Sequence, residues 1–140
     1  MESAISDTTT HQPTQSVLVI DDSVFALDVF KELLAQLGVK DVQSAPDGLA
    51  AKRLLASMPK QPDFLICDLF MPNMDGIEFL DLLAKQGYPG GVLIVTGVDT
   101  EMLRLTSFIA SSAGLNILGT LEKPVSLEQL STVMGLPIIS

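Results

Sequence analysis

Short apolar runs of strand length recur along this chain and alternate with longer segments of helical periodicity. The run Ser16–Ile20 is continuous and rich in β-branched residues, as expected of a strand that is buried on both faces. Phe64–Cys67 and Val92–Val95 are also apolar throughout, whereas Val42–Ala45 and the segment around Ile117–Leu118 carry weaker strand signals. The pattern therefore predicts five strands.

Helix signals follow each of these runs. Ser23 is a preferred N-cap residue, and a single helical stripe of apolar residues then runs as far as Gly38, a typical stop residue. The stripe consists of Leu27, Phe30, Leu34 and Leu37. Further helices are predicted over Leu49–Met58, Ile77–Lys85 and Thr100–Ser112, and after Ser126, where Gln129 would complete a capping box. Five strands alternating with five helices predict an α/β fold: a doubly wound parallel sheet with right-handed crossovers and helices on both faces.

The length and composition fit one folded domain. The chain has 140 residues, of which 47% are apolar and 18% charged, and it contains neither an internal repeat nor a linker that would separate two domains. We expect a disordered leader over residues 1–15, a folded domain over 16–134 and a short C-terminal tail over 135–140. Cys67 is the single cysteine, so no internal disulfide can form, and we expect a core thiol in a cytoplasmic protein.

The charge balance is strongly acidic, with 17 Asp and Glu against 8 Lys and Arg and a formal net charge of −9. A surface of this kind repels a phosphate backbone, which argues against nucleic-acid binding. No apolar stretch reaches the ~20 residues that a membrane span needs, and the polar N-terminus lacks the features of a signal peptide. We therefore expect neither a nucleic-acid nor a membrane partner.

Polar residues at the ends of the predicted strands are the informative exceptions to the apolar pattern. Asp21 and Asp22 follow the first strand, Asp68 the third, Thr96 the fourth and Lys123 the fifth. In an open parallel sheet the carboxyl ends of all strands lie along one edge, and ligands bind in the crevice there. The topology therefore predicts that three carboxylates, one hydroxyl and one ammonium group converge.

Such a cluster has a specific chemistry. Three neighbouring carboxylates repel one another and favour a hard divalent cation, and Mg²⁺ combines a few carboxylates with water and substrate phosphate oxygens. Lys123 would offer a positive charge, and Thr96 a hydrogen bond, to phosphoryl oxygens. A carboxylate in this setting can act as a nucleophile toward phosphorus. Each residue alone also has an ordinary reading as a cap, a turn residue or a surface lysine, but those readings do not explain why all five follow strands.

The sequence also resembles the receiver domain of bacterial two-component response regulators. The resemblance is carried by the runs VLVIDDS, LICDLFMPNMDGIEFL, LIVTG and LEKP, in order and on the expected elements, from about Ser16 to Met134. It implies a flavodoxin-like sheet with strand order 2-1-3-4-5. It also implies a module that catalyses only its own phosphorylation and dephosphorylation and is otherwise no enzyme.

The resemblance assigns a role to each site residue. Asp68 would be the phosphoacceptor and a Mg²⁺ ligand, Asp22 a second direct Mg²⁺ ligand, and Asp21 the holder of a metal-bound water. The backbone carbonyl of Phe70 would complete the protein's metal ligands. Thr96 and Lys123 would bind phosphoryl oxygens and carry the switch, and the Lys123-Pro124 peptide bond is cis in the family.

Two departures from the family pattern concern the signalling face. Family members usually carry Tyr or Phe three residues before the conserved lysine, and this chain has Thr120 there. The segment between Thr96 and Lys123 is also longer than in the simplest members, with residues 113–115 lying inside it. The switch surface is therefore expected to work differently, while the site chemistry is unaffected.

The resemblance also implies partners. A sensor histidine kinase or a phosphotransfer protein would supply the phosphoryl group, and a downstream effector domain or protein would receive the signal, with a homodimer as a further option. The stretch SSAGLNILGTLEKP, residues 111–124, resembles receivers that are joined to cyclic-di-GMP phosphodiesterase domains.

Two other functions remain open from the sequence. A degenerate receiver would act only as a protein-interaction module, but it would lack an acid, the threonine or the lysine. A Mg²⁺-dependent phosphohydrolase of the haloacid-dehalogenase type needs a second acid two residues after the nucleophile, where this chain has Phe70. Phe70 and Val98 occupy the positions that line the path of a hydrolytic water in receivers, and neither can hydrogen-bond to it through its side chain. Phe70 is also bulky enough to shield the phosphoryl group from solvent; the alternative interpretation is that both side chains only cover the rim of the site as packing residues. If Phe70 shields the phosphoryl group, its loss should be slow.

Overall fold

The computed structural model describes residues 15–71, 74–97 and 100–139 of the chain. Residues 1–14 of the predicted leader and Val98 lie outside the described residues, so the leader and the role of Val98 stay predictions. Within the described ranges, no helix is long and apolar enough to cross a membrane.

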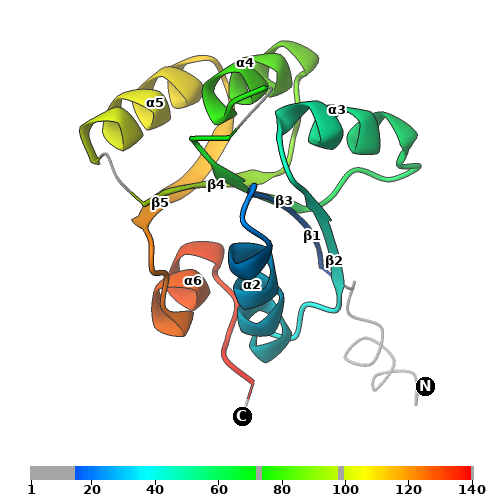
Figure 1. Ribbon diagram of the computed structural model, residues 1–140, viewed down its shortest axis with the longest axis vertical. Helices are drawn as coiled ribbons and strands as arrows, with labels where there is room; N and C mark the ends of the chain where they lie inside the picture. Colours follow the sequence, from blue (N-terminus) through cyan, green and yellow to red (C-terminus); the bar gives the residue numbers. More distant parts are fainter. Residues whose placement is uncertain (1–14, 72–73, 98–99, 140) are drawn as a thin grey trace, which may run out of the picture.

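A single parallel sheet forms the middle of the molecule (Figure 1). Its strands are β1 (Ser16–Ile20), β2 (Asp41–Ala45), β3 (Phe64–Asp68), β4 (Gly91–Thr96) and β5 (Asn116–Glu122). The observed order β2-β1-β3-β4-β5 confirms the predicted doubly wound, flavodoxin-like topology.

Helices cover both faces of this sheet, as predicted. Helices α2 (Val24–Gln36) and α6 (Leu127–Met134) lie on one face, and α3 (Gly48–Ser57), α4 (Gly76–Gln86) and α5 (Thr100–Ser112) lie on the other (Figure 1). The predicted helix boundaries agree with the observed ones to within two residues. The Ser126 capping box is present, with both reciprocal hydrogen bonds to Gln129, and Gly38 has the positive φ of +80° that stops α2.

The core has one apolar layer on each side of the sheet. Alternate residues of β1 point to opposite faces: Val17 and Val19 pack with Phe30 and Leu34 of α2, while the intervening strand residues pack toward α3 and α4. This two-sided burial is the reason why the strand is apolar without interruption, since no position along it faces water.

Strand β5 is longer than the sequence pattern predicts. It runs to Glu122 and contains an irregularity, because Val92 pairs with Ile117 but Leu93 pairs with Gly119, which leaves Leu118 as an extra residue. The register beyond this bulge places Glu122 opposite Thr96, the last residue of β4. Lys123 therefore leaves the sheet beside the end of β4.

Candidate acidic site at the carboxyl edge of the sheet

The predicted site residues come together at the carboxyl ends of β1, β3, β4 and β5. Asp21 directly follows β1, and its backbone N–H donates to the carbonyl of Ala45 at the end of β2 (3.0 Å). Asp68 is the last residue of β3 and lies opposite Val95, so Thr96 is one position further along the neighbouring strand. The backbone N–H of Lys123 donates to the Thr96 carbonyl (2.8 Å), which ties the end of β5 to β4.

Three carboxylates form the centre of this site. One oxygen each of Asp21, Asp22 and Asp68 lies within 4.8 Å of the others. Asp21 and Asp68 are buried, at 1% and 5% exposure, and Asp22 is exposed. The cluster therefore has two carboxylates with little access to water and a third at its solvent side.

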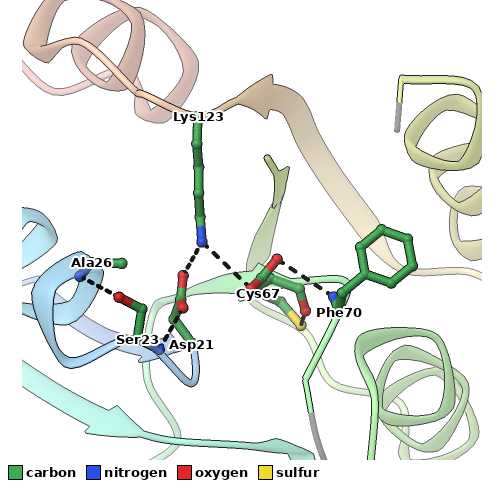
Figure 2. Close-up of polar contacts among 7 residues, drawn as sticks. Asp21, Ser23, Ala26, Cys67, Phe70 and Lys123 are labelled. Carbon is green, nitrogen blue, oxygen red and sulfur yellow. Dashed lines mark hydrogen bonds and ion pairs between the residues drawn. The ribbon is translucent and has the colours of Figure 1, made fainter. Parts of the chain in front are cut away.

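Lys123 places its ammonium group against the two buried carboxylates. Its Nζ lies 2.5 Å from Oδ2 of Asp21 and 3.4 Å from Oδ2 of Asp68. Figure 2 shows the side chain reaching from the end of β5 to Asp21. Sequence reasoning expected Lys123 to contact a phosphoryl oxygen and missed this short contact with Asp21, which joins residues 102 positions apart.

Asp21 is held on its other side by the start of α2. Its Oδ1 accepts the backbone N–H of Ser23 (2.9 Å), while the Ser23 hydroxyl accepts the N–H of Ala26 (3.2 Å) as the helix N-cap (Figure 2). Both oxygens of Asp21 therefore have a donor, one from α2 and one from Lys123. The Ser23 cap was predicted from sequence, but its N–H contact with Asp21 was not.

The electrostatics of the site reflect burial and mutual repulsion. Burial raises the pKa of Asp68; the charge of Lys123 opposes this shift and that of Asp21 adds to it, with a net upward direction. Burial lowers the pKa of Lys123, but its hydrogen bonds and attraction to Asp21 and Asp68 outweigh burial, so the net shift is upward. The lysine is therefore held in its charged form as the counter-ion of the acids.

The donor set fits a hard divalent cation. All the candidate side-chain ligands are carboxylate oxygens, and one cationic side chain cannot neutralise three carboxylates. The carbonyl role predicted for Phe70 stays a prediction; its backbone N–H makes a long contact of 3.5 Å with Oδ1 of Asp68. Phe70 is 43% exposed, and its ring lies to one side of Lys123 and Asp21 in Figure 2. Shielding of a phosphoryl group by this ring stays a prediction.

Gly76, the first residue of α4, packs tightly against the end of β3. The N–H of Gly76 donates to the Leu69 carbonyl (2.9 Å), and a Cβ atom at residue 76 would collide with the backbone carbonyl of Asp68. Asp75 accepts the N–H of Glu78 (2.9 Å) and caps α4, which gives this acid a structural role. The close backbone contact at Gly76 therefore fixes the start of α4 against the end of β3.

The position of the missing aromatic residue lies beside a small hollow. Thr120 is partly buried in β5 and, with Leu103, Arg104, Glu122 and others, lines a space of about 280 Å³ between α5, β5 and α6. A threonine is too small to fill it. The Lys123-Pro124 peptide bond at the end of the same strand is cis, as the resemblance implied.

Comparisons with known proteins agree with this geometry. Residues 17–134 match the family model described as response regulator receiver domain. The chain is 34% identical to cyclic di-GMP phosphodiesterase RocR of Pseudomonas aeruginosa over 119 residues, which cover 85% of this chain and 30% of that protein. It is 40% identical to protein-glutamate methylesterase/protein-glutamine glutaminase 4 of Anaeromyxobacter dehalogenans over 83 residues, covering 59% and 22%.

A solved structure gives the same result for the fold. The chain superposes on the response regulator receiver domain protein of Clostridium thermocellum with a TM-score of 0.73 and 27% identity, covering 86% of this chain and 91% of that one. By contrast, the chain spans about a third or less of the two curated relatives named above, so their enzymatic activities do not transfer with the match. The family match over nearly the whole sheet, together with the acidic site at its carboxyl edge, places this chain in the response regulator receiver domain family of two-component signalling.

Proposed function

We propose that Asp68 is the phosphoacceptor of this receiver and that its phosphorylation switches a protein-interaction surface. The observation that carries the proposal is the convergence of three carboxylates and Lys123 from the ends of three strands, β1, β3 and β5. An oxygen of Asp68 attacks phosphorus, a new O–P bond forms, and the bond to the donor nitrogen of a phosphohistidine breaks, with its electron pair returning to the imidazole.

The protein's own residues have distinct roles in this transfer. Asp68 supplies the nucleophilic oxygen. Lys123 exchanges part of its contact with Asp21 for a phosphoryl oxygen, and the Thr96 hydroxyl donates to another. Because these contacts exist only with the phosphoryl group, they favour a different arrangement of the β4 and β5 ends, which is what makes phosphorylation a switch.

Mg²⁺ is the cofactor that these residues suit. Asp22 and Asp68 would be its carboxylate ligands, Asp21 would hold a bound water, and the Phe70 carbonyl would be the fourth protein contact. When bound, the ion would neutralise the negative charge that accumulates on the transferred phosphoryl group.

The phosphodonor must dock at the rim of this site, and α2 offers an apolar surface there. Val24 and Phe25 are highly exposed, and a hollow of about 350 Å³ beside them is lined in part by Lys123 and Pro124. An exposed apolar patch next to a buried acceptor supports docking by a sensor histidine kinase or a phosphotransfer protein. The phosphoryl group of such a donor comes originally from ATP, which favours the cytoplasm as the compartment of this function.

We further propose that the signal passes to an effector domain or protein, and that this chain has no other catalytic activity. The 34% identity to a cyclic di-GMP phosphodiesterase favours cyclic-di-GMP turnover as the output. The interaction-only alternative predicts no phosphorylation. The phosphohydrolase alternative needs an acid at residue 70, where the side chain is Phe.

The test is phosphorylation of the purified chain by a small donor such as acetyl phosphate, followed by intact mass. One phosphoryl group should appear in Mg²⁺ buffer and none with EDTA. Asp68→Asn should abolish it, Asp22→Ala should weaken Mg²⁺ binding, and Asp28→Asn, an exposed acid on α2, serves as the matched control. Full phosphorylation of the Asp68→Asn protein would sink the assignment, and unchanged metal affinity in Asp22→Ala would sink the ligand role alone.

A further inference from the structure

An apolar groove is lined by residues of α4 and α5. These two helices lie on the face of the sheet opposite α2 and α6 (Figure 1). Its volume is about 420 Å³. Its described lining residues are Ile77, Glu78, Leu80 and Asp81 of α4, with Met102, Leu105, Thr106, Ile109, Ala110 and Ala113 of or just after α5. The α5 members recur every three or four residues, so they form one stripe along the helix.

The groove has a buried floor and exposed apolar walls. Leu80, Thr106 and Ala110 are buried at its base, and the small side chains of the last two leave the hollow open. Leu105 and Ile109 on the α5 side remain 54% and 57% exposed, and Ile77 on the α4 side 42%. Large apolar side chains gathered along one groove mark an interaction surface rather than ordinary scattered exposure.

The acidic residues that line the groove favour a partner with basic residues. Glu78 and Asp81 are the charged residues among its described lining, and both are acidic. Lys85 partly neutralises Asp81 through an ion pair of 2.9 Å in which both side chains are exposed to solvent. A second copy of this chain would bring the same acids and a net charge of −9 into the contact, which disfavours self-association through this face.

We propose that this groove binds an amphipathic helix of a partner protein, with apolar residues on one stripe and Lys or Arg beside it. Such a helix would place side chains at i, i+3/i+4 and i+7 between Leu105 and Ile109 on one side and Ile77 on the other. Its basic residues would face Glu78 and Asp81. The groove would be the surface that binds the output partner of the proposed function. It contains no residue of the acidic site, so its binding can be tested independently of phosphorylation.

The probe is a labelled peptide of about 18 residues, long enough to form a helix, with leucines on one stripe and lysines elsewhere. Fluorescence anisotropy with the full chain should show binding, and a peptide with glutamates in place of the lysines should bind at least about tenfold more weakly. Leu105→Ser and Ile109→Ser should each weaken binding on the order of tenfold, because each removes roughly half a buried aliphatic side chain from the contact. Circular dichroism would confirm that both variants remain folded.

Matched control variants distinguish binding in the groove from unspecific hydrophobic or electrostatic binding elsewhere on the surface. Phe25→Ser removes a more exposed apolar side chain on the other face of the sheet and should leave binding unchanged. Glu78→Gln with Asp81→Asn should weaken binding severalfold at low salt, whereas Asp28→Asn with Glu32→Gln on α2 should not. Asp68→Asn should bind the peptide as tightly as the parent chain does. Peptide binding would therefore still support the groove even if Asp68 proved not to be the phosphoacceptor.

Three results would overturn the proposal. The first is no binding of the lysine peptide, or equal binding of the glutamate peptide. The second is equal weakening by Phe25→Ser, which would mean unspecific hydrophobic adsorption. The third is a parent chain that self-associates in sedimentation and becomes monomeric with Leu105→Ser or Ile109→Ser, which would make a second copy the occupant.

Discussion

The contact of Lys123 with two buried carboxylates leads to a quantitative prediction. Replacing Lys123 by Met keeps an aliphatic side chain of similar length and removes only the charge. The matched control is Lys85→Met, which removes an ion pair of comparable N–O distance, 2.9 Å, on the surface of α4. The two lysines differ chiefly in burial, since their side chains are 26% and 74% exposed.

The magnitude follows from the geometry of the two contacts. At 2.5 Å and 3.4 Å, and an effective dielectric constant of about 20, the gross attractions are about 7 and 5 kcal/mol. Desolvation offsets most of this, and removing one partner of a buried pair costs about 3–5 kcal/mol. Because Lys123 is partly exposed, we expect a loss of about 2–3 kcal/mol in unfolding free energy, against less than about 1 kcal/mol for Lys85→Met.

The assay is urea unfolding followed by far-ultraviolet circular dichroism, once in EDTA and once in saturating Mg²⁺. In EDTA the Lys123→Met protein has repelling buried carboxylates without a counter-ion, so it should be the less stable variant. Mg²⁺ supplies that counter-ion, and in this variant it no longer competes with the lysine for Asp21. Mg²⁺ should therefore raise the unfolding free energy of Lys123→Met more than that of the parent, because the stabilisation by a bound ion increases with its affinity for the folded state.

The reasoning would be refuted by two outcomes. Equal stability of Lys123→Met and Lys85→Met in EDTA would mean that the contact with Asp21 carries no net free energy. Equal stabilisation of parent and variant by Mg²⁺ would mean that the lysine and the ion do not compete. Phosphorylation of Lys123→Met can still proceed slowly, but its donor-induced NMR shift changes should shrink, and unchanged shifts would remove Lys123 from the switch.

Three further predictions concern other parts of the chain. Burial raises the pKa of Tyr88 above its value in the unfolded chain, and the nearby charge of Asp63 adds to this shift. The contribution of Tyr88 to stability should therefore be constant below about pH 10 and fall above it. Tyr88→Phe should lose this alkaline dependence. The same variant loses the hydrogen bond to the Pro62 carbonyl (2.6 Å) and should be about 1 kcal/mol less stable at neutral pH, measured by urea unfolding. Gly76→Ala forces a Cβ atom into the backbone at the end of β3, so it should lower the unfolding free energy by about 1–3 kcal/mol and reduce the extent of phosphorylation. Unfolding free energy and phosphorylation equal to the parent's would show that the backbone can shift to make room for the Cβ atom. Phe70→Asn, combined with Val98→Glu, should speed dephosphorylation after donor removal and leave Mg²⁺ affinity unchanged, and a decay no faster than the parent's would rule out shielding.

The fold and the convergence of the acidic residues with Lys123 could be predicted from local sequence patterns. A strand such as β1 is apolar at every position because both of its faces are buried, and this signal is local, so it can be read from five residues. Parallel topology then brings the ends of those strands to one edge, and Asp21, Asp68 and Lys123 had to meet there. The Ser126 capping box was predictable for the same reason, since its partners are three residues apart.

Which of these groups touch depends on packing that no local pattern in the sequence records. Lys123 contacts Asp21 more closely than Asp68, and this choice depends on the length and bulge of β5, which set where the lysine leaves the sheet. The weak pattern around Ile117 contained no sign of that bulge.

The groove between α4 and α5 was equally invisible in the sequence. Apolar periodicity in α5 marks the residues that could be buried, but it does not distinguish Leu103, which is covered by the core, from Leu105 and Ile109, which are not. Burial is a property of what packs against a side chain, and for a helix that covers a sheet this is set by neighbours far away in the sequence. Chemistry at strand ends is thus encoded locally, whereas contacts and exposed surfaces arise only when the layers are assembled.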